Sequence, residues 1–455
     1  MVKVLVPSGV LGLQFDQDAL REGLERRPDL IAIDGGSTDS GPYYLGTGTS
    51  KYASATTQNE LRILIEAQNR AKVPLIITSA GTCGTNRSVD WLVGIANEIA
   101  HSLKINLKIA TIKSSQEPET IKRAWLDKKL LALQYAPSIS AEIIENCQNI
   151  VALMGVEQIQ AALNTGADIV IAGRATDTAS IAALPLLHST QAGIAWHGAK
   201  IAECGALCST HPMSGCILVE FFDTYCEVEP LHPDAQCTPY SVSSHMLYEN
   251  ANPFKLIEPG GYLDVTEAQY EAVSPKRVRV SGSKWIQAKQ YSVKLEGVGI
   301  SGYQTTTLTL LRNQHYIKNA ATWVNNLKSY LLETIEQSFE LNPKQFSLDF
   351  RLIGSNSTLG KLETKNTNPA EIGVLCIVTA DTQDIANEIA KHANPYFLHY
   401  PLSADEELPT FSFPYSPAET PRGPLYEFYL NHALDVSDPM EPFQLEVIEV
   451  NGTTR

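Results

Sequence analysis

Four short segments of the sequence combine glycines with side chains that can transfer protons or bind anions. They span residues 34–41, 79–84, 173–177 and 197–205, and each follows an apolar stretch typical of a buried strand. Ligands of parallel sheets bind beyond the carboxyl ends of the strands, where such segments would meet. We therefore expect the active site to be built from these four segments.

Asp34 ends the first of these apolar stretches, and the two glycines after it would let the backbone approach a ligand closely. Ser37 adds a hydroxyl group for substrate binding. The Asp-Gly-Gly-Ser-Thr run is similar to the first phosphate loop of sugar kinases, but that loop opens its domain, whereas this one follows a parallel-type unit. The alternative without a ligand is an Asx-turn followed by a tight glycine turn.

Arg174 and Asp177 follow the apolar stretch 168–172. An arginine in this position can bind a carboxylate or a phosphate through two parallel hydrogen bonds. Asp177 is a candidate general base, and the alternatives are a salt bridge to Arg174 or a helix N-cap. In the last segment His197 and Glu203 are candidate general acid–base groups, with a solvated surface helix as the alternative.

The segment 79–84 precedes a helix whose N–H groups can hold an anion. Its expected substrate-binding residues are Ser79, Gly81, Thr82, Cys83 and Gly84. Cys83 is also a candidate nucleophile, because a helix N terminus lowers the pKa of a thiol, although an inert buried thiol is the simpler interpretation. The segment lacks the G-x-G-x-x-G dinucleotide pattern and the chain lacks a G-x-S-x-G hydrolase elbow, so no organic cofactor is expected.

Composition limits the partners and the location. The 455 residues carry a net charge of −15, which disfavours nucleic acid and anionic membrane surfaces because both need a basic patch. No apolar stretch approaches the about 18 residues of a membrane span, so we expect a cytoplasmic protein with a small-molecule partner.

The eight cysteines include no CxxC pair. Cys204, Cys208 and His211 could be metal ligands, but their spacing is loose for a tetrahedral thiolate site. The histidines also lack the HxxxH and HExxH spacings of zinc hydrolases. We therefore expect buried free thiols and no metal.

The elements that position these residues alternate along the first 200 residues. Apolar strands are expected at 2–6, 30–33, 75–78, 107–111, 150–154 and 168–172, with helices at 18–26, 57–71, 88–103, 117–127 and 157–164. This order predicts an α/β fold, with a mostly parallel sheet covered by helices on both faces.

Residues 1–285 are expected to form the α/β catalytic domain, of which 206–285, rich in proline, is a loop-rich connecting region. Strands at 290–295 and 305–311 look like a pair, and a helix follows at 320–337. Strands at 347–353 and 372–379 and a helix at 385–392 complete an α+β ferredoxin-like domain over 286–455. This domain would pack on the first or mediate assembly, and we expect a homo-oligomer.

The run Gly166-Ala-Asp-Ile-Val-Ile-Ala-Gly-Arg-Ala-Thr-Asp-Thr178, with His197-Gly and Glu203-Cys-Gly-Ala, resembles the acyclic terpene utilisation (AtuA-like) family. Residues 241–261 are similar to the stretch that follows these motifs, and 386–401 resemble a small domain often paired with the family. The resemblance implies Arg174, Asp177, Glu203 and Cys204 as site positions. It also implies a role near the degradation of acyl-CoA esters or small carboxylates.

Together these features favour a hydratase or lyase-type enzyme that acts on a small hydroxy- or unsaturated carboxylate, or on its CoA thioester. Arg174 would hold the carboxylate, and Asp34, His197 or Glu203 would move protons. Amides of the segment 81–84 would stabilise an oxyanion. The alternatives are a non-catalytic ligand-binding or assembly subunit and a thiol-dependent hydrolase that uses Cys83 or Cys204.

Overall fold

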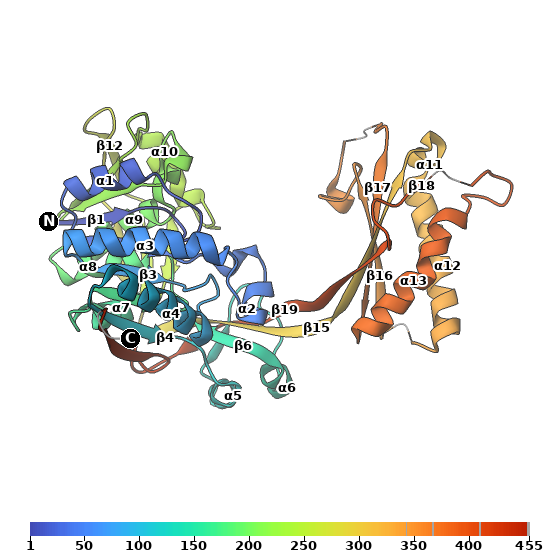
Figure 1. Cartoon of the computed structure of the whole chain (residues 1–455), viewed down its shortest axis with the longest axis horizontal. Coiled ribbons are helices and arrows are strands. Elements are labelled where there is room, and N and C mark those ends of the chain that lie inside the picture. Colours follow the sequence, from blue (N-terminus) through green and yellow to red (C-terminus); the bar gives the residue numbers. More distant parts are fainter. Residues whose placement is uncertain (343, 366–367, 409–410, 453–455) are drawn as a thin grey trace. The chain divides into compact units, whose positions relative to one another are not determined.

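The computed structural model describes residues 1–342, 344–365, 368–408 and 411–452, and Figure 1 shows its elements. The chain forms two compact units, Met1–Gly299 with Phe428–Arg455, and Ile300–Glu427. The second unit is therefore inserted between two parts of the first. The boundary was expected near 285, whereas the two units divide between Gly299 and Ile300. This point lies within strand β15 (Ser292–Leu311), which contributes residues to both units.

The first unit is built on a ten-stranded sheet with the order β12-β13-β9-β8-β1-β2-β3-β7-β4-β20. Its five central strands are parallel and consist largely of valine, isoleucine and leucine, as expected when both faces are buried. They are β1 (Val2–Val6), β2 (Leu30–Asp34), β3 (Leu75–Thr78), β7 (Ile169–Ala172) and β4 (Leu107–Lys113). The predicted α/β class is confirmed.

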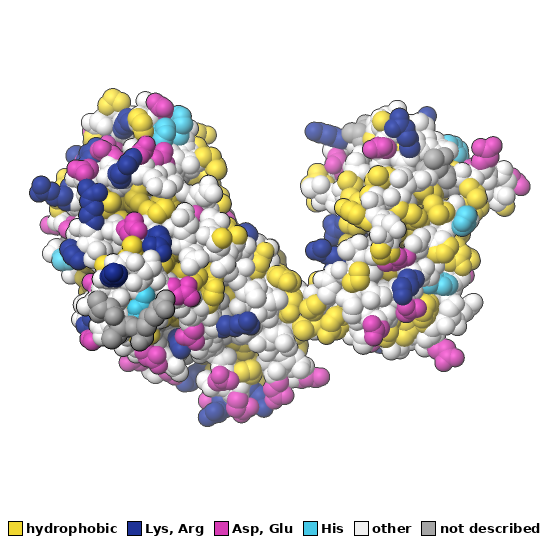
Figure 2. All heavy atoms as spheres, viewed as in Figure 1, with side chains coloured by type: hydrophobic (Ala, Val, Ile, Leu, Met, Phe, Trp, Pro, Cys, Tyr) yellow, Lys and Arg dark blue, Asp and Glu magenta, His cyan; other side chains and the backbone are white. Residues whose placement is uncertain are grey.

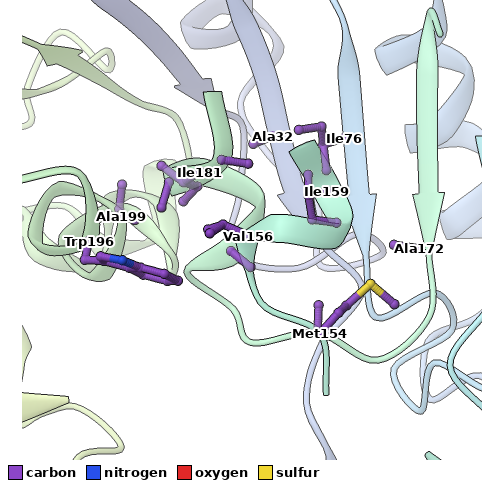
Figure 3. Packing of buried hydrophobic residues seen from close by; sticks show 14 of the residues in the cluster. Ala32, Ile76, Met154, Val156, Ile159, Ala172, Ile181, Trp196 and Ala199 are labelled. Carbon is purple, nitrogen blue, oxygen red and sulfur yellow. The ribbon is translucent and has the colours of Figure 1, made fainter. Parts of the chain in front are cut away.

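Helices cover both faces of the parallel strands. Along β2, Ile31 and Ile33 pack into one core with helices α1 (Gln17–Glu25), α3 (Ser54–Ala71) and α4 (Asn86–Leu103). Leu30 and Ala32 pack into the other core with α7 (Val156–Leu163), α8 (Ala179–Leu187) and α9 (Ala192–Ala202), which Figure 3 shows from close by. Side chains of a strand alternate between its faces, so each strand contributes to both cores.

The sheet is mixed, which corrects the expectation of a mostly parallel sheet. Beside β1 lie four antiparallel strands, and a fifth, β20 (Gln444–Val450), pairs with β4. The four are β8 (Ile217–Phe221), β9 (Tyr225–Pro230), β13 (Val278–Ser281) and β12 (Gln269–Ala272). All four lie in the segment 206–285, which was expected to be loop-rich. Prolines and glycines mark turns between short strands as well as loops, so they did not distinguish the two.

The same segment forms helix α10 (Pro239–Ser244) and a three-stranded antiparallel sheet of β10 (Lys255–Glu258), β11 (Gly261–Asp264) and β14 (Lys284–Gln287). Shorter elements of the first unit are α2 (Tyr43–Thr47), α5 (Pro118–Leu126) and α6 (Ala141–Glu145). On the face seen in Figure 2, described side chains of both charges are interspersed. No helix within the described ranges is both long and apolar enough to span a bilayer.

A second, antiparallel sheet lies toward the C terminus, with the order β16-β17-β15-β19-β5. Its strands are β16 (Phe346–Ile353), β17 (Ile372–Ala380), β15, β19 (Glu419–Asp435) and β5 (Leu130–Ala132), with β18 (Phe411–Ser412) and β6 (Cys147–Ala152) also paired to β15. Helices α11 (Gln314–Lys318), α12 (Ala320–Phe339) and α13 (Gln383–His399) belong to the second unit. In that unit, α12 and α13 share a core with β16 and β17.

Two strand assignments need correction. Residues 290–295 and 305–311 do not pair with each other, because both lie in or beside the single strand β15. Strand β6, expected in the parallel sheet, instead pairs antiparallel with the start of β15. The run Gly297-Val-Gly-Ile-Ser-Gly302 fits the letters of a dinucleotide loop, but it lies inside β15 and opens no helix.

Candidate functional site

Three neighbouring parallel strands bring predicted site residues to one edge of the main sheet. Strand β2 ends at Asp34, β3 is followed directly by Ser79, and Arg174 comes two residues after β7. Because β2, β3 and β7 are adjacent in that order, the three side chains meet at the carboxyl ends of the strands. Three of the four predicted segments therefore converge.

Glycines allow the backbones of these loops to touch. A Cβ atom on Gly35 would lie 2.3 Å from the carbonyl oxygen of Ser79, and one on Gly84 would lie 2.1 Å from the nitrogen of Arg174. Ser79 and Thr82 adopt left-handed backbone angles, with φ of 48° and 76°. Such angles are strained for these residue types and often occur at functional sites. The glycines thus bring the loops together, whereas the sequence analysis expected them to face a ligand.

Arg174 is buried at the centre of the edge. Its Nε donates to Glu296 Oε2 at 3.2 Å, and its Nη1 donates to Ser79 Oγ and to the carbonyl oxygen of Ala175, both at 3.2 Å. Nη1 also lies 3.6 Å from Asp177 Oδ1. These contacts hold the guanidinium in place and leave Nη2 without an acceptor among the described residues.

Glu296, on β15, is the buried counter-charge of Arg174. Its Oε2 also accepts from Thr38 Oγ1 at 2.9 Å, and its Oε1 accepts from Lys294 Nζ at 2.9 Å. Burial alone would raise the pKa of Glu296, but the charges of Arg174 and Lys294 outweigh burial and lower it to about 2. Glu296 is therefore a fixed negative charge and not a proton carrier at neutral pH.

Asp34 is buried in the same cluster, but its pKa is raised, whereas that of Glu296 is lowered. Its Oδ1 accepts from Thr78 Oγ1 at 3.0 Å and its Oδ2 from the amide of Gly36 at 3.2 Å. Burial, and next the charge of Asp177, raise the pKa of Asp34 well above its ordinary value, while Arg174 opposes them. Asp34 can therefore hold a proton inside the site.

A second cluster lies at the end of α9. Lys200 Nζ donates to Glu203 Oε1 and, at 3.0 Å, to the carbonyl oxygen of Tyr248. Burial raises the pKa of Glu203 to about 8, against the lowering effect of Lys200. The helix is buried along its length, so the alternative of a solvated surface helix is excluded.

Glu258, at the end of β10, adds a third buried carboxyl group. Its Oε1 accepts from Thr178 Oγ1 at 2.5 Å, whereas its Oε2 is buried with no hydrogen-bond partner among the described residues. Burial raises the pKa of Glu258 to about 7. A carboxyl group with this pKa exchanges a proton readily at neutral pH.

Asp177 joins the two clusters. It is partly exposed, and its charge acts on Asp34 and Arg174 on one side and on Glu203 and Glu258 on the other. The two clusters are therefore within electrostatic reach of each other. Their residues end β2 and β10, follow β7 and α9, or lie on β15, and Asp177 is partly exposed to solvent.

His197 lies apart from these groups. It is fully buried, its Nδ1 lies 2.6 Å from Ser283 Oγ, and its Nε2 lies 3.2 Å from the hydroxyl of Tyr270. Burial lowers the pKa of His197 to about 3, so the ring is neutral. Both ring nitrogens serve the packing of α9 against its neighbours.

The remaining predicted residues are close to the site but already have partners. Cys83 is fully buried, with its Sγ 3.2 Å from Ser88 Oγ, and Ser37 caps a short turn of 3₁₀ helix by bonding Asp39. The amides of Thr82, Cys83 and Gly84 donate to carbonyl oxygens of the segment 79–81. These three amides are therefore not available to an oxyanion. Unlike these residues, Thr82 has a buried hydroxyl with no hydrogen-bond partner among the described residues. Gly81 contributes a left-handed turn.

Glu296 and Glu258 were not predicted from the sequence. Arg174 and Glu296 are 122 residues apart, and Thr178 and Glu258 are 80 apart. The available signal was an acidic residue within an apolar strand, which is rarely buried unless it is paired or protonated. That signal indicates a buried charge but does not identify its partner.

A family model described as "Acyclic terpene utilisation family protein AtuA" matches residues 41–210 and 229–414. The matched parts contain Arg174, Glu203, Glu258 and Glu296, whereas Asp34 precedes them. No curated protein and no solved structure matches the chain. The match covers most of the sequence and confirms the resemblance of its motifs, without separating a C-terminal domain. The chain therefore belongs to the acyclic terpene utilisation family AtuA.

Proposed function

We propose that the first unit is a lyase-type enzyme, a hydratase, that acts on a small hydroxy- or unsaturated carboxylate or its CoA thioester. The observation that carries the proposal is the convergence of Asp34, Glu203 and Glu258 around Asp177 and Arg174. All three carboxyl groups have raised pKa values. Carboxyl groups whose pKa values are raised by burial can carry a proton inside the site and are suited to general acid–base catalysis.

The reaction needs two proton carriers. Addition of water to a double bond beside a carbonyl group requires a base that activates the water and an acid that protonates the α carbon. The reverse reaction exchanges these two roles. The charge of Asp177 acts on both Asp34 and Glu258, and in this proposal one of these two groups gives a proton while the other takes one. Their protonated forms also reduce the repulsion that an anionic substrate would otherwise meet.

Arg174 is the proposed binding group for the substrate carboxylate. Glu296 and Ser79 fix two of its nitrogens, so Nη2 is held in one direction without losing rotational freedom on binding. A charge-assisted hydrogen bond from Nη2 would orient the carboxylate next to Asp34. Glu296 is a positioning residue in this scheme.

A cavity next to Gly81, whose Cβ would lie 3.1 Å from Ser88 and 3.7 Å from Ser50 of its lining, supports a substrate larger than a free acid. It has a volume of about 360 Å³ and is lined in part by Tyr52, Arg87 and Trp91. Burial, and next the charge of Asp34, raise the pKa of Tyr52. An exposed guanidinium and an indole ring offer binding groups for the phosphate and the adenine of a CoA ester.

The thiol-dependent alternative has less support. Burial raises the pKa of Cys204, so its thiol is protonated at neutral pH, and Cys83 is inaccessible in the core. A non-catalytic binding subunit is the second candidate, favoured by the many existing partners of Arg174.

We further propose that the second unit is ferredoxin-like and mediates assembly into a homo-oligomer of a cytoplasmic protein. Its elements follow the order β15, α12, β16, β17, α13 and β19. Its strands lie in the order β16-β17-β15-β19, which is the arrangement of a split β-α-β pair. The oligomer would appear as a multiple of the 49.8 kDa chain in light scattering.

The reaction is tested by solvent exchange in D₂O, followed by proton NMR, with small unsaturated and hydroxy-carboxylates and their CoA thioesters. We expect exchange of the α proton of at least one compound, slowed at least ~100-fold in Asp34→Asn and Glu258→Gln. Glu60→Gln is the control, since Glu60 is also buried but its carboxyl group accepts from the backbone amides of Gly12 and Gln14.

A thermal-shift series separates the two candidate functions. If a carboxylate raises the melting temperature, and Arg174→Lys abolishes the rise, but no compound exchanges its proton, the chain is a binding subunit. Exchange at the wild-type rate in both carboxyl variants would contradict the proposed enzyme.

A further inference from the structure

We infer that Glu203, Cys204 and His245 form a binding site for a divalent metal ion of the zinc type. One ligand atom from each of these residues lies within 4.8 Å of the other two. This inference is independent of the proposed reaction, because its test measures metal binding alone.

The three side chains are held by two short, adjacent stretches of chain. Glu203 and Cys204 follow the last turn of α9, and His245 begins a 3₁₀ turn, His245–Leu247, directly after α10. Lys200 bonds both to Glu203 and to the carbonyl oxygen of Tyr248, so it ties the two stretches together. The ligand atoms are therefore positioned by the fold before any ion binds.

His245 gives the second, independent indication of a ligand. Its side chain is buried, with 4% of its surface exposed, and its Nε2 has no hydrogen-bond partner among the described residues. A buried imidazole nitrogen without a partner is costly unless something unseen satisfies it. Its other contact is stacking on the ring of Tyr248. A metal ion would satisfy the nitrogen that the protein leaves unpaired.

The ligand types select the metal. A cysteine sulfur and an imidazole favour zinc-like ions, whereas calcium and magnesium prefer oxygen ligands alone. Zinc bonds of about 2.0–2.3 Å would place the ligand atoms roughly 3.4–3.8 Å apart. The three atoms must therefore move together by about 1 Å, which small side-chain rotations can provide. Three protein ligands leave the fourth tetrahedral position open.

The surrounding charges favour a cation in spite of Lys200. Lys200 occupies Glu203 Oε1, which leaves the second oxygen, Oε2, for the ion. The acidic side chains of Asp177, Glu249 and Glu258 act on the same cluster, and a bound cation would favour their ionised forms. With a metal bound, Glu203 becomes a ligand, and Asp34 and Glu258 remain as the two proton carriers.

In the sequence, Cys204 stands in one group with Cys208 and His211, whose loose spacing predicts no metal site. In the structure Cys208 lies against Cys237, and His211 stacks on His232. Cys204 thus belongs to both groups. In the fold its neighbours in the candidate site are Glu203 and His245, in place of Cys208 and His211.

Cobalt is the probe for the test, because its complexes with thiolates absorb light and those of zinc do not. The full chain, stripped with a chelator, is titrated with Co²⁺ and then with Zn²⁺. We expect one equivalent to bind, a thiolate charge-transfer band in the near ultraviolet, and loss of the band when zinc displaces cobalt. Cys204→Ser should abolish the band, and His245→Gln should weaken binding at least ~10-fold.

Matched controls are Cys226→Ser and His232→Gln, which alter the same residue types outside the group and should bind cobalt as the wild type does. A readout without any variant uses alkylation. Seven of the eight cysteines are buried, and Cys204 is partly exposed. Saturating Zn²⁺ should slow iodoacetamide labelling of Cys204, located by mass spectrometry, at least ~10-fold. A missing band, a band that survives in Cys204→Ser, or labelling that zinc does not slow would each overturn the inference.

Discussion

Replacement of Glu296 by glutamine tests whether the Arg174 pair organises the site. Glutamine keeps the size of the side chain and can still accept from Arg174 and Thr38, so the change removes mainly the charge. In the folded protein the pKa of Glu296 falls from 4.5 to about 2. At about 1.4 kcal/mol for each tenfold change in ionisation, this corresponds to about 3 kcal/mol of stability at neutral pH.

The size of the effect can be expressed as a melting temperature. For a unit of roughly 330 residues the unfolding entropy is roughly 0.7 kcal/mol/K, so a loss of about 3 kcal/mol lowers the midpoint by roughly 4–5 °C. This figure is an upper value for two reasons. In the variant, Arg174 still has the carboxylate of Asp177 at 3.6 Å from its Nη1. Asp34 can also release its proton and so replace part of the lost negative charge. Differential scanning calorimetry at pH 7 measures the difference directly.

The pH dependence identifies the cause. Because folding lowers the pKa of Glu296, its contribution is complete above pH 4.5 and is lost as the pH falls toward 2. The difference between the wild type and Glu296→Gln should therefore shrink to less than half between pH 6 and pH 3. Equal melting temperatures at pH 7, or a difference that does not change with pH, would refute the reasoning.

Glu60→Gln provides the matched comparison. Burial raises the pKa of Glu60, although the amides of Gly12 and Gln14 oppose the effect. Its contribution to stability is therefore present at low pH and lost as the pH rises. The difference between this variant and the wild type should change with pH in the opposite direction to that of Glu296→Gln.

Two further variants test the packing around the site. His197→Gln should leave α-proton exchange within about twofold of the wild type. Because burial lowers the pKa of His197 to about 3, the wild type should lose more stability than the variant as the pH falls from 6.5 to 3. Melting temperatures measured against pH give this difference. Gly84→Ala should destabilise the chain by roughly 3 kcal/mol or more, since its Cβ would overlap Arg174 and its φ is 64°. Gly94→Ala, at an exposed position of α4 where the new Cβ would meet no atom within 4 Å, should stabilise the chain by up to about 1 kcal/mol. Equal melting temperatures for the two alanine variants would contradict the packing described.

Local patterns in the sequence were sufficient to predict the elements of the parallel core. The apolar stretches at 2–6 and 75–78 coincide with β1 and β3, because a strand buried on both faces is apolar throughout. The rule that ligands bind at the carboxyl ends of parallel strands then placed Asp34 and Arg174 together. Both steps depend only on short-range information.

Pairing between distant segments could not be predicted in the same way. An isolated strand does not reveal its neighbour, so β6 was assigned to the wrong sheet and the pairing of β20 with β4 was not predicted. The same limit applies to Glu296 and Glu258, whose partners are many residues away. His197 was misleading for another reason. On a helix buried on all sides, a polar side chain can face a structural partner such as Ser283 as easily as a substrate.

The pairing of β20 with β4 also affects how the chain acquires its fold during synthesis. Roughly 330 residues separate the two strands, so at about 5–20 residues per second the ribosome needs roughly 20–60 s to deliver β20 after β4 has emerged. During this interval the edge of β4 has no partner, and an open edge strand is a site of aggregation. Glu296 also emerges well after Arg174, so the nascent site holds an arginine without its counter-charge. The order of synthesis therefore makes the main sheet, and with it the site, among the last parts of the molecule to be completed.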